Sequence, residues 1–257
     1  KNTVFPFEYN NYKQLLKIVD DHDIGVIKME VIRNSPPKND FLHKVKMLST
    51  EKNIVLIFDE CTSGFRETFG GIHLKYNVEP DIVMFGKTLG NGYAITAVVG
   101  KKEVMEAAQK TFISSTFWTE RIGPTAALKS LEVMEKEKSW EKISGIGEKI
   151  QANWKKIAQN HKIDIEVKGI PALSTFKFNN PSNLEFKTFL TQQFLKKGYL
   201  GSTSFYSSIA HTDEIMKDYF EVFDEIFFQI SKCINGEMAI KDLLKYPVSH
   251  SGFKRLN

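Results

Sequence analysis

The stretch IVLIFDE, residues 54–60, contains the strand pattern that decides the fold class and the first candidate functional residues. Its apolar part, rich in β-branched side chains, predicts a strand covered on both faces, as in a parallel sheet. Asp59 and Glu60 follow directly at the carboxyl end of this strand. In open α/β sheets that edge is where ligands bind, and a carboxylate there is costly unless a cation or a donor accompanies it. This strand end is therefore the first candidate site.

Strand and helix patterns alternate on both sides of this stretch. Before it, residues 25–32 predict a strand and residues 40–51 a helix. After it, we expect strands at residues 81–85 and 94–99, a helix at 101–109 and long helical structure at 124–160. Such alternation is typical of the α/β class with a mostly parallel sheet.

The pattern changes near Lys162, where a second domain begins. Residues 163–168 and 173–178 predict two strands joined by a Gly-Ile-Pro turn. Helices are expected at residues 184–197 and 213–234, the latter with one continuous apolar stripe. The predicted organisation is an α/β domain at residues 1–160 and a small α+β domain at residues 161–257.

Composition and charge exclude several functional classes. Among 257 residues, 42% are hydrophobic and 26% charged, which is ordinary globular composition. The 35 basic and 31 acidic residues leave a net charge of +4, too small to favour nucleic acid or a membrane surface as partner. The apolar runs fall far short of the ~20 residues of a membrane helix. Two cysteines and six histidines form no metal-binding pattern, and few cysteines favour a cytoplasmic setting.

Two chemistries use an apolar strand that ends in Asp-Glu. One is the magnesium-binding acid of P-loop NTPases, which requires a glycine-rich phosphate loop. The residues Gly86-Lys87-Thr88 fit the end of such a loop, but Asp81 stands where its first glycine is needed. Because the loop is mechanically required, the NTPase interpretation is set aside.

The other chemistry is that of pyridoxal 5'-phosphate. This cofactor needs a lysine amine for its aldehyde and an acid at its pyridine nitrogen, which keeps the ring an electron sink. Asp59 can supply the acid. Lys87 follows the predicted strand at 81–85 and opens a turn with three glycines, which permit close approach of a flat ring.

At this point the sequence resembles a known family, the class III aminotransferases. Residues 56–66, LIFDECTSGFR, are similar to its D-E-V-x-x-G-F-R motif. Residues 76–83, YNVEPDIV, and the pair Gly86-Lys87 resemble its Y-G-V-x-P-D and G-K segments, in the same order and spacing. The resemblance is strong over residues 25–134 and traceable to the end, including AHTD at 210–213. Within the class, the glutamate-1-semialdehyde aminomutase branch is most similar.

The resemblance implies a pyridoxal-phosphate enzyme of fold type I and assigns roles to four residues. Lys87 would be the catalytic Schiff-base lysine and would also move the substrate proton. Asp59 would pair with the pyridine nitrogen, and Cys61 would replace the family's valine against the ring face. Thr116 would bind the cofactor phosphate of a neighbouring subunit, which predicts a homodimer with shared active sites.

Departures from the family pattern bear on the substrate. Glu30 matches the acid of an E-P pair, but Val31 replaces the proline. Arg66 matches the arginine of G-F-R, and we expect a structural ion-pair role before a substrate contact. Residues 118–121, WTER, replace a small glycine-rich loop of the aminomutases. This favours a different amino substrate.

Family members are much longer, and their segments before the position of Glu30 complete the cofactor site. We therefore expect this chain to be the C-terminal part of a longer enzyme that transfers an amino group between a small-molecule donor and acceptor. The alternatives are glutamate-1-semialdehyde 2,1-aminomutase and a non-catalytic fragment that keeps only the scaffold. Retention of both Lys87 and Asp59 argues against the last.

Overall fold

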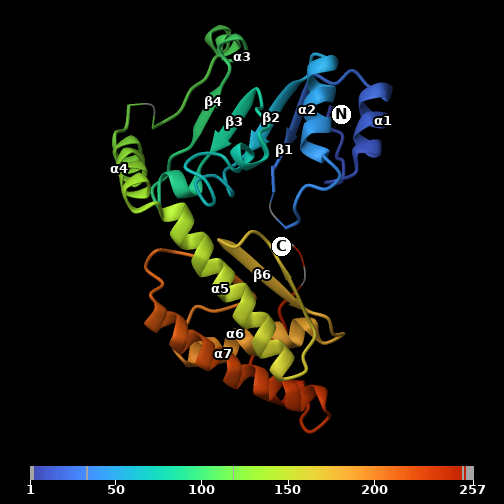
Figure 1. Cartoon of the computed structure of the whole chain (residues 1–257), viewed down its shortest axis with the longest axis vertical. Coiled ribbons are helices and arrows are strands. Elements are labelled where there is room, and N and C mark those ends of the chain that lie inside the picture. The colour runs from blue at the N-terminus through green and yellow to red at the C-terminus, as the bar shows by residue number, and fades with distance from the viewer. Residues whose placement is uncertain (1–2, 33, 118, 251, 253–257) are drawn as a thin grey trace. The chain divides into compact units, whose positions relative to one another are not determined.

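The computed structural model describes residues 3–32, 34–117, 119–250 and 252. The chain divides into two compact units, residues 1–141 and 142–257. Figure 1 shows that each unit combines a sheet with helices.

The first unit is built on a four-stranded sheet. Its strands, in spatial order, are β1 (Val26–Met29), β2 (Val55–Asp59), β3 (Ile82–Phe85) and β4 (Ala97–Gly100). The first three are parallel and β4 is antiparallel to β3. The predicted α/β fold with a mostly parallel sheet is thus confirmed.

Two helices belong to the β1 side of this sheet. They are α1 (Tyr12–Asp21) and α2 (Phe41–Glu51), and α2 connects β1 to β2. Val45 on α2 and Leu56 and Phe58 on β2 are fully buried. The other face of β2 is only half-buried, so the expectation of a strand covered on both faces is wrong. That face carries Asp59, whose charge requires a polar environment.

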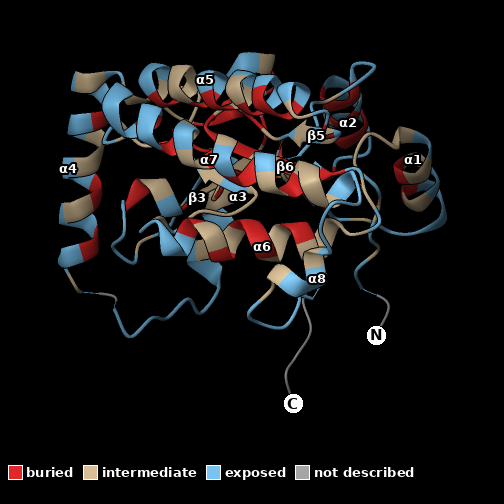
Figure 2. Cartoon of the chain, turned by 90° about the horizontal axis from the view of Figure 1, so that it is seen from below, coloured by how far each residue is buried: buried red, intermediate tan, exposed pale blue. Residues whose placement is uncertain are grey.

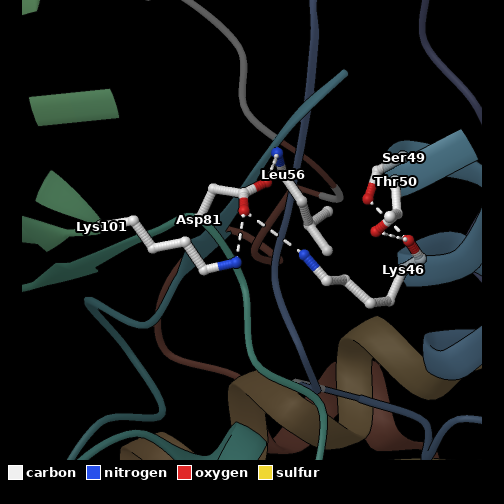
Figure 3. A network of polar contacts seen from close by, with 6 residues as sticks. All are labelled: Lys46, Ser49, Thr50, Leu56, Asp81 and Lys101. Atoms are coloured by element: carbon white, nitrogen blue, oxygen red, sulfur yellow. Dashed lines mark hydrogen bonds and ion pairs between the residues drawn. The ribbon is translucent and has the colours of Figure 1, made fainter. Parts of the chain in front are cut away.

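An ion-pair network at the amino ends of β2 and β3 locks the sheet to its neighbours (Figure 3). Asp81 accepts hydrogen bonds from Lys101 Nζ at 2.9 Å and from Lys46 Nζ at 3.3 Å. Its other oxygen accepts from the Leu56 backbone N–H at 2.9 Å. Burial alone would raise the pKa of Asp81, but these donors hold it below its usual value. Asp81 therefore fixes the strands at the end opposite to the candidate site.

The helices that follow β4 are shorter than the pattern predicts. The segment expected to be one helix at 101–109 is α3 (Lys102–Met105) followed by a 3-10 turn, η3 (Glu106–Lys110). The long helical pattern at 124–160 forms two helices, α4 (Ile122–Glu137) and α5 (Ser139–Asn160). Lys138 separates them because it adopts a left-handed conformation, with φ of 46°.

The second unit contains an antiparallel sheet and long helices. Its strands are β5 (Ile165–Lys168), β6 (Leu173–Phe178) and β7 (Ser204–Tyr206), in that order. Its helices after α5 are α6 (Asn183–Lys196), α7 (Asp213–Ile234) and α8 (Ile240–Leu243). The small α+β unit was predicted, but its third strand and α8 were not.

Aromatic side chains form the core of the second unit. Phe176 and Phe178 of β6 pack with Phe223 and Phe227 of α7, all of them buried. Figure 2 shows buried residues along α5, α6 and α7. Trp154 of α5 belongs to this core and donates a hydrogen bond to the Tyr219 hydroxyl at 2.9 Å. The predicted boundary lies at the end of α5, whereas the units divide near its start, because α5 packs on this core.

Candidate active site

The carboxyl ends of β2 and β3 lie side by side and carry the candidate residues. Asp59 ends β2 and pairs in register with Met84 of β3. Glu60 continues the pairing, because its N–H donates to the Met84 carbonyl at 2.9 Å. Lys87 lies three residues after Met84 and is the first residue of the 3-10 turn η2 (Lys87–Leu89). Two adjacent strands thus bring an acid and an amine to one edge.

Glu60 organises the loop that follows β2. Its carboxylate is fully buried and accepts hydrogen bonds from Ser63 Oγ at 3.0 Å and from the Ile72 and His73 backbone N–H groups at 2.7 and 3.0 Å. The His73 ring nitrogen Nδ1 lies 2.7 Å from the same carboxylate. Four partners satisfy its oxygens, so Glu60 is structural and holds the loop in place.

Gly64 allows this loop to turn tightly against β3. Its N–H donates to the Glu60 carbonyl at 2.8 Å. A Cβ at this position would lie 2.7 Å from that carbonyl oxygen and 2.8 Å from Cδ1 of Phe85. Only glycine fits without displacement of the backbone, which explains the glycine of the G-F-R segment.

Asp59 is ionised and held by two neighbours. Its Oδ2 lies 3.0 Å from Lys28 Nζ, and its Oδ1 accepts from the Cys61 backbone N–H at 3.2 Å. Burial works to raise the pKa of Asp59, but the hydrogen bonds from Lys28 and Cys61 outweigh it and hold the pKa below its usual value. A carboxylate in this state can accept a hydrogen bond from a protonated ring nitrogen.

Lys87 is exposed and reaches back toward the β2 loop. Its ammonium donates to Thr62 Oγ1 at 2.8 Å. Its backbone lies in the left-handed region, with φ of 42°, which is costly for a residue with a long side chain. Such conformations cluster at active sites and ligand clamps. The fold thus aims the Lys87 amine at the loop that begins with Asp59.

The other residues of the loop support this arrangement. Arg66 Nε donates to the Thr62 carbonyl at 2.9 Å, so it closes the turn that positions the Thr62 hydroxyl. Cys61 is half-buried, and burial raises the pKa of its thiol, as does its hydrogen bond to Asp59. The thiol therefore stays protonated at neutral pH and acts as a small polarisable surface beside Asp59.

Thr116 and its flanking residues precede α4 in the first unit. Thr116 is exposed and lies in a turn. Glu120, one of the residues that replace the glycine-rich loop, accepts hydrogen bonds from the N–H groups of Ile122 and Gly123 and so caps α4. Trp118 lies outside the described residues.

A cavity of about 850 Å³ opens at the carboxyl end of β1. Lys28 and Glu30 line it, together with aromatic side chains of the N-terminal segment and with Lys38. Glu30, whose role the sequence left open, therefore faces a cavity next to the Asp59 partner. The described residues hold no cluster of three metal-ligating side chains, and none of their helices is long and apolar enough to cross a bilayer.

Lys28 and Thr62 are the functional candidates that sequence reasoning missed. Thr62 lies inside the D-E motif, but its contact with Lys87 depends on the pairing of β2 with β3. Lys28 could have been noticed, because it is the only charged residue within the short strand β1. A charge on a strand face predicts a partner on the neighbouring strand.

With this geometry established, comparisons identify the family. The aminotransferase class III family model matches residues 33–227, so the chain belongs to this family, whose cofactor is pyridoxal 5'-phosphate. It is 29% identical over 245 residues to the 3-aminobutyryl-CoA aminotransferase of Cloacimonas acidaminovorans, covering 90% of this chain and 59% of that protein. It is 30% identical over 212 residues to the glutamate-1-semialdehyde 2,1-aminomutase of Methanosphaera stadtmanae, covering 78% and 50%.

The fold agrees with that of known transaminases. The Sphingopyxis sp. MTA144 FumI protein, solved in its PLP internal aldimine form, superposes with a TM-score of 0.84 at 21% identity, over 93% of this chain and 60% of that one. The chain thus spans about half to three fifths of the length of the relatives it matches. The predicted fold type I and family are confirmed.

Proposed function

We propose that this chain supplies the lysine and the ring-nitrogen acid of a pyridoxal-phosphate site that carries out transamination. One observation carries the proposal: Lys87 and the ionised Asp59 stand at the carboxyl ends of two adjacent parallel strands. Ligands of α/β sheets bind at this edge. In this proposal the first unit is the C-terminal part of the cofactor-binding domain, and the second unit is the small C-terminal domain.

The residues present fit the cofactor. An aldehyde requires an accessible amine, and Lys87 is exposed and held by one hydroxyl hydrogen bond that can be exchanged. A pyridinium requires a carboxylate that stays ionised, and Asp59 has a lowered pKa. The adjacent Thr88 hydroxyl is buried without a hydrogen-bond partner among the described residues, which marks an unused polar group next to Lys87.

Each residue then has a separate task. When bound, pyridoxal phosphate supplies an electron sink for the charge that develops on the substrate carbon. Asp59 would keep the ring nitrogen protonated, because its carboxylate can accept a hydrogen bond from it. Lys87 would supply the amine that holds the cofactor and, when that amine is free, would take up and return the substrate proton. Thr62 orients the Lys87 amine, and Cys61 would offer the ring a small apolar surface.

We further propose that the working unit is a homodimer that acts on a small-molecule amino donor and acceptor. Thr116 would bind the phosphate of the partner's cofactor. Its position in an exposed turn, next to the exposed Phe117, supports a role at an interface rather than within its own unit. The cytoplasmic setting stays a prediction that rests on the two free cysteines.

A second candidate function is that of an aminomutase. It is supported by the 30% identity to the Methanosphaera protein. The altered residues after Thr116 argue for a different substrate. Both reactions need the same lysine and acid, so they share the test below.

The test is covalent trapping in the protein that carries this chain. Borohydride converts a lysine–aldehyde bond into a stable secondary amine, which peptide mass spectrometry locates. We expect the label on Lys87 and on no other lysine. Lys87→Ala should abolish the label, whereas Lys102→Ala, which removes an exposed lysine of α3, should retain it. A label elsewhere, or none in the unchanged protein, would contradict the proposal.

A further inference from the structure

The partner of Asp59 in this structure is a side chain whose role the proposed function leaves unassigned. Lys28 stands on β1, pairs in register with Ile57 of β2, and places its ammonium 3.0 Å from Asp59 Oδ2. The other oxygen, Oδ1, accepts from the Cys61 backbone N–H at 3.2 Å. Both carboxylate oxygens therefore already have a donor.

The protonated ring nitrogen of the cofactor would also need a hydrogen bond to an Asp59 oxygen. Either Lys28 or the Cys61 N–H must then give up its oxygen or share it with the ring. The Cys61 N–H cannot leave, because it belongs to the turn that follows Asp59 directly. Lys28 can leave, since its side chain is 51% exposed and long enough to swing. Two cations on one carboxylate oxygen also repel each other.

A displaced Lys28 ammonium can move into a neighbouring cavity. Lys28 lines the cavity of about 850 Å³ at the carboxyl end of β1, with Glu30 and Asn34 on its wall. An ammonium that leaves Asp59 can keep its hydration and polar contacts there. Displacement therefore exchanges one cation at Asp59 for another without leaving a buried charge unpaired.

We propose that Lys28 competes with the cofactor for Asp59: its ammonium occupies Oδ2 until cofactor binds, and binding displaces it into the adjoining cavity. The inference rests on the proposed function. Before cofactor arrives, Lys28 neutralises the Asp59 carboxylate. Afterwards it contributes an exposed positive charge beside the site.

The first test measures cofactor affinity. Lys28→Met keeps an unbranched apolar stem and removes the competing charge. We expect pyridoxal phosphate to bind this variant about twofold to fivefold more tightly at neutral pH, the range that a half-exposed ion pair supports. Lys38→Met is the matched control. Lys38 lines the same cavity, but the lysine that forms the ion pair with Asp59 is Lys28. The affinity of Lys38→Met should equal that of the unchanged protein.

The second test follows Lys28 itself. Limited acetylation, read by peptide mass spectrometry, should modify Lys28 several times faster after the cofactor has been loaded and fixed with borohydride. The rate at Lys38 should not change. An unchanged or weaker affinity in Lys28→Met, or an unchanged or slower rate at Lys28, would overturn the inference.

The two proposals fail in different ways. If cofactor is trapped on Lys87 but Lys28→Met binds it no more tightly, only the role of Lys28 is wrong. If no cofactor is trapped on Lys87 in the unchanged protein, the proposed function is wrong and the role of Lys28 falls with it.

Discussion

Two aromatic-rich stretches, helix α7 of the second unit and the residues before α4 in the first, differ in how far they are buried. In the second unit, Tyr219, Phe223 and Phe227 recur at helical spacing on α7 and are buried. In the first unit, the stretch before α4 leaves Phe112 and Phe117 exposed, at 95% and 72%. We call residues 112–117 of this stretch the exposed apolar segment.

The difference lies in periodicity rather than in composition. A spacing of three to four residues places side chains on one helix face, where a single partner surface covers them all. The exposed apolar segment contains no helix or strand, so its side chains share no common inner face. Large exposed apolar groups mark interaction surfaces, which supports the proposed dimer contact around Thr116.

The largest effect on stability should come from the buried aromatic core of the second unit. Phe223→Ala should destabilise the chain by about 3–5 kcal/mol, because it leaves a cavity in the aromatic core. Phe112→Ala should change the free energy of unfolding by about 0.5 kcal/mol or less, since that ring already faces solvent. Urea denaturation followed by circular dichroism measures both. Equal losses would show that the two regions do not differ as described.

An intermediate effect should appear in self-association. Phe117→Ser should weaken the dimer about tenfold or more in sedimentation equilibrium, because aromatic side chains dominate such interfaces. Phe228→Ser is the matched control, since Phe228 is 51% exposed on α7 in the second unit. The control should leave association unchanged. If only the control weakened it, the interface would lie on the other unit.

The smallest effect should be the acid dependence of the Asp59–Lys28 pair. The pKa of Asp59 is lowered from 3.8 in the folded chain, so its contribution is present in full above the unfolded value and fades as pH falls through the folded one. Asp59→Asn should therefore cost about 1 kcal/mol or less at pH 6, and this difference should shrink below about pH 3.8.

Urea titrations of both proteins at several pH values test this expectation. The exposed Lys149–Asp213 pair of the second unit provides the contrast. Its contribution should vanish in high salt, whereas that of the half-buried Asp59 should persist in part. A difference between the unchanged protein and Asp59→Asn that grows toward acid pH would have the wrong sign for this pair.

Local patterns sufficed for most of the fold. The helix predicted at 213–234 matches α7 end to end, because its apolar stripe is long and regular. The short strand β7 was missed, since three residues carry no periodic signal and depend on pairing with β6. The break between α4 and α5 at Lys138 was also missed. The apolar residues on both sides keep helical spacing in the sequence, so nothing local marks the left-handed residue between them.

The candidate site was likewise predictable from the sequence only in part. Asp59, Cys61 and Lys87 were named from motifs, and the structure places them on one edge, although their roles stay predictions. Thr62 and Lys28 were not named, because each matters through a contact with a residue distant in the chain. The role of Thr116 stays a prediction that depends on the proposed partner copy.

By itself, the sequence determined the α/β class, the family and which acid and lysine stand at strand ends, because these follow from residue order and local periodicity. Only the tertiary structure decided which groups face them. Strand pairing brings Lys28 to Asp59 and Thr62 to Lys87. Register and side-chain direction arise when strands meet, and a one-residue shift of β1 against β2 would turn Lys28 to the face opposite to Asp59.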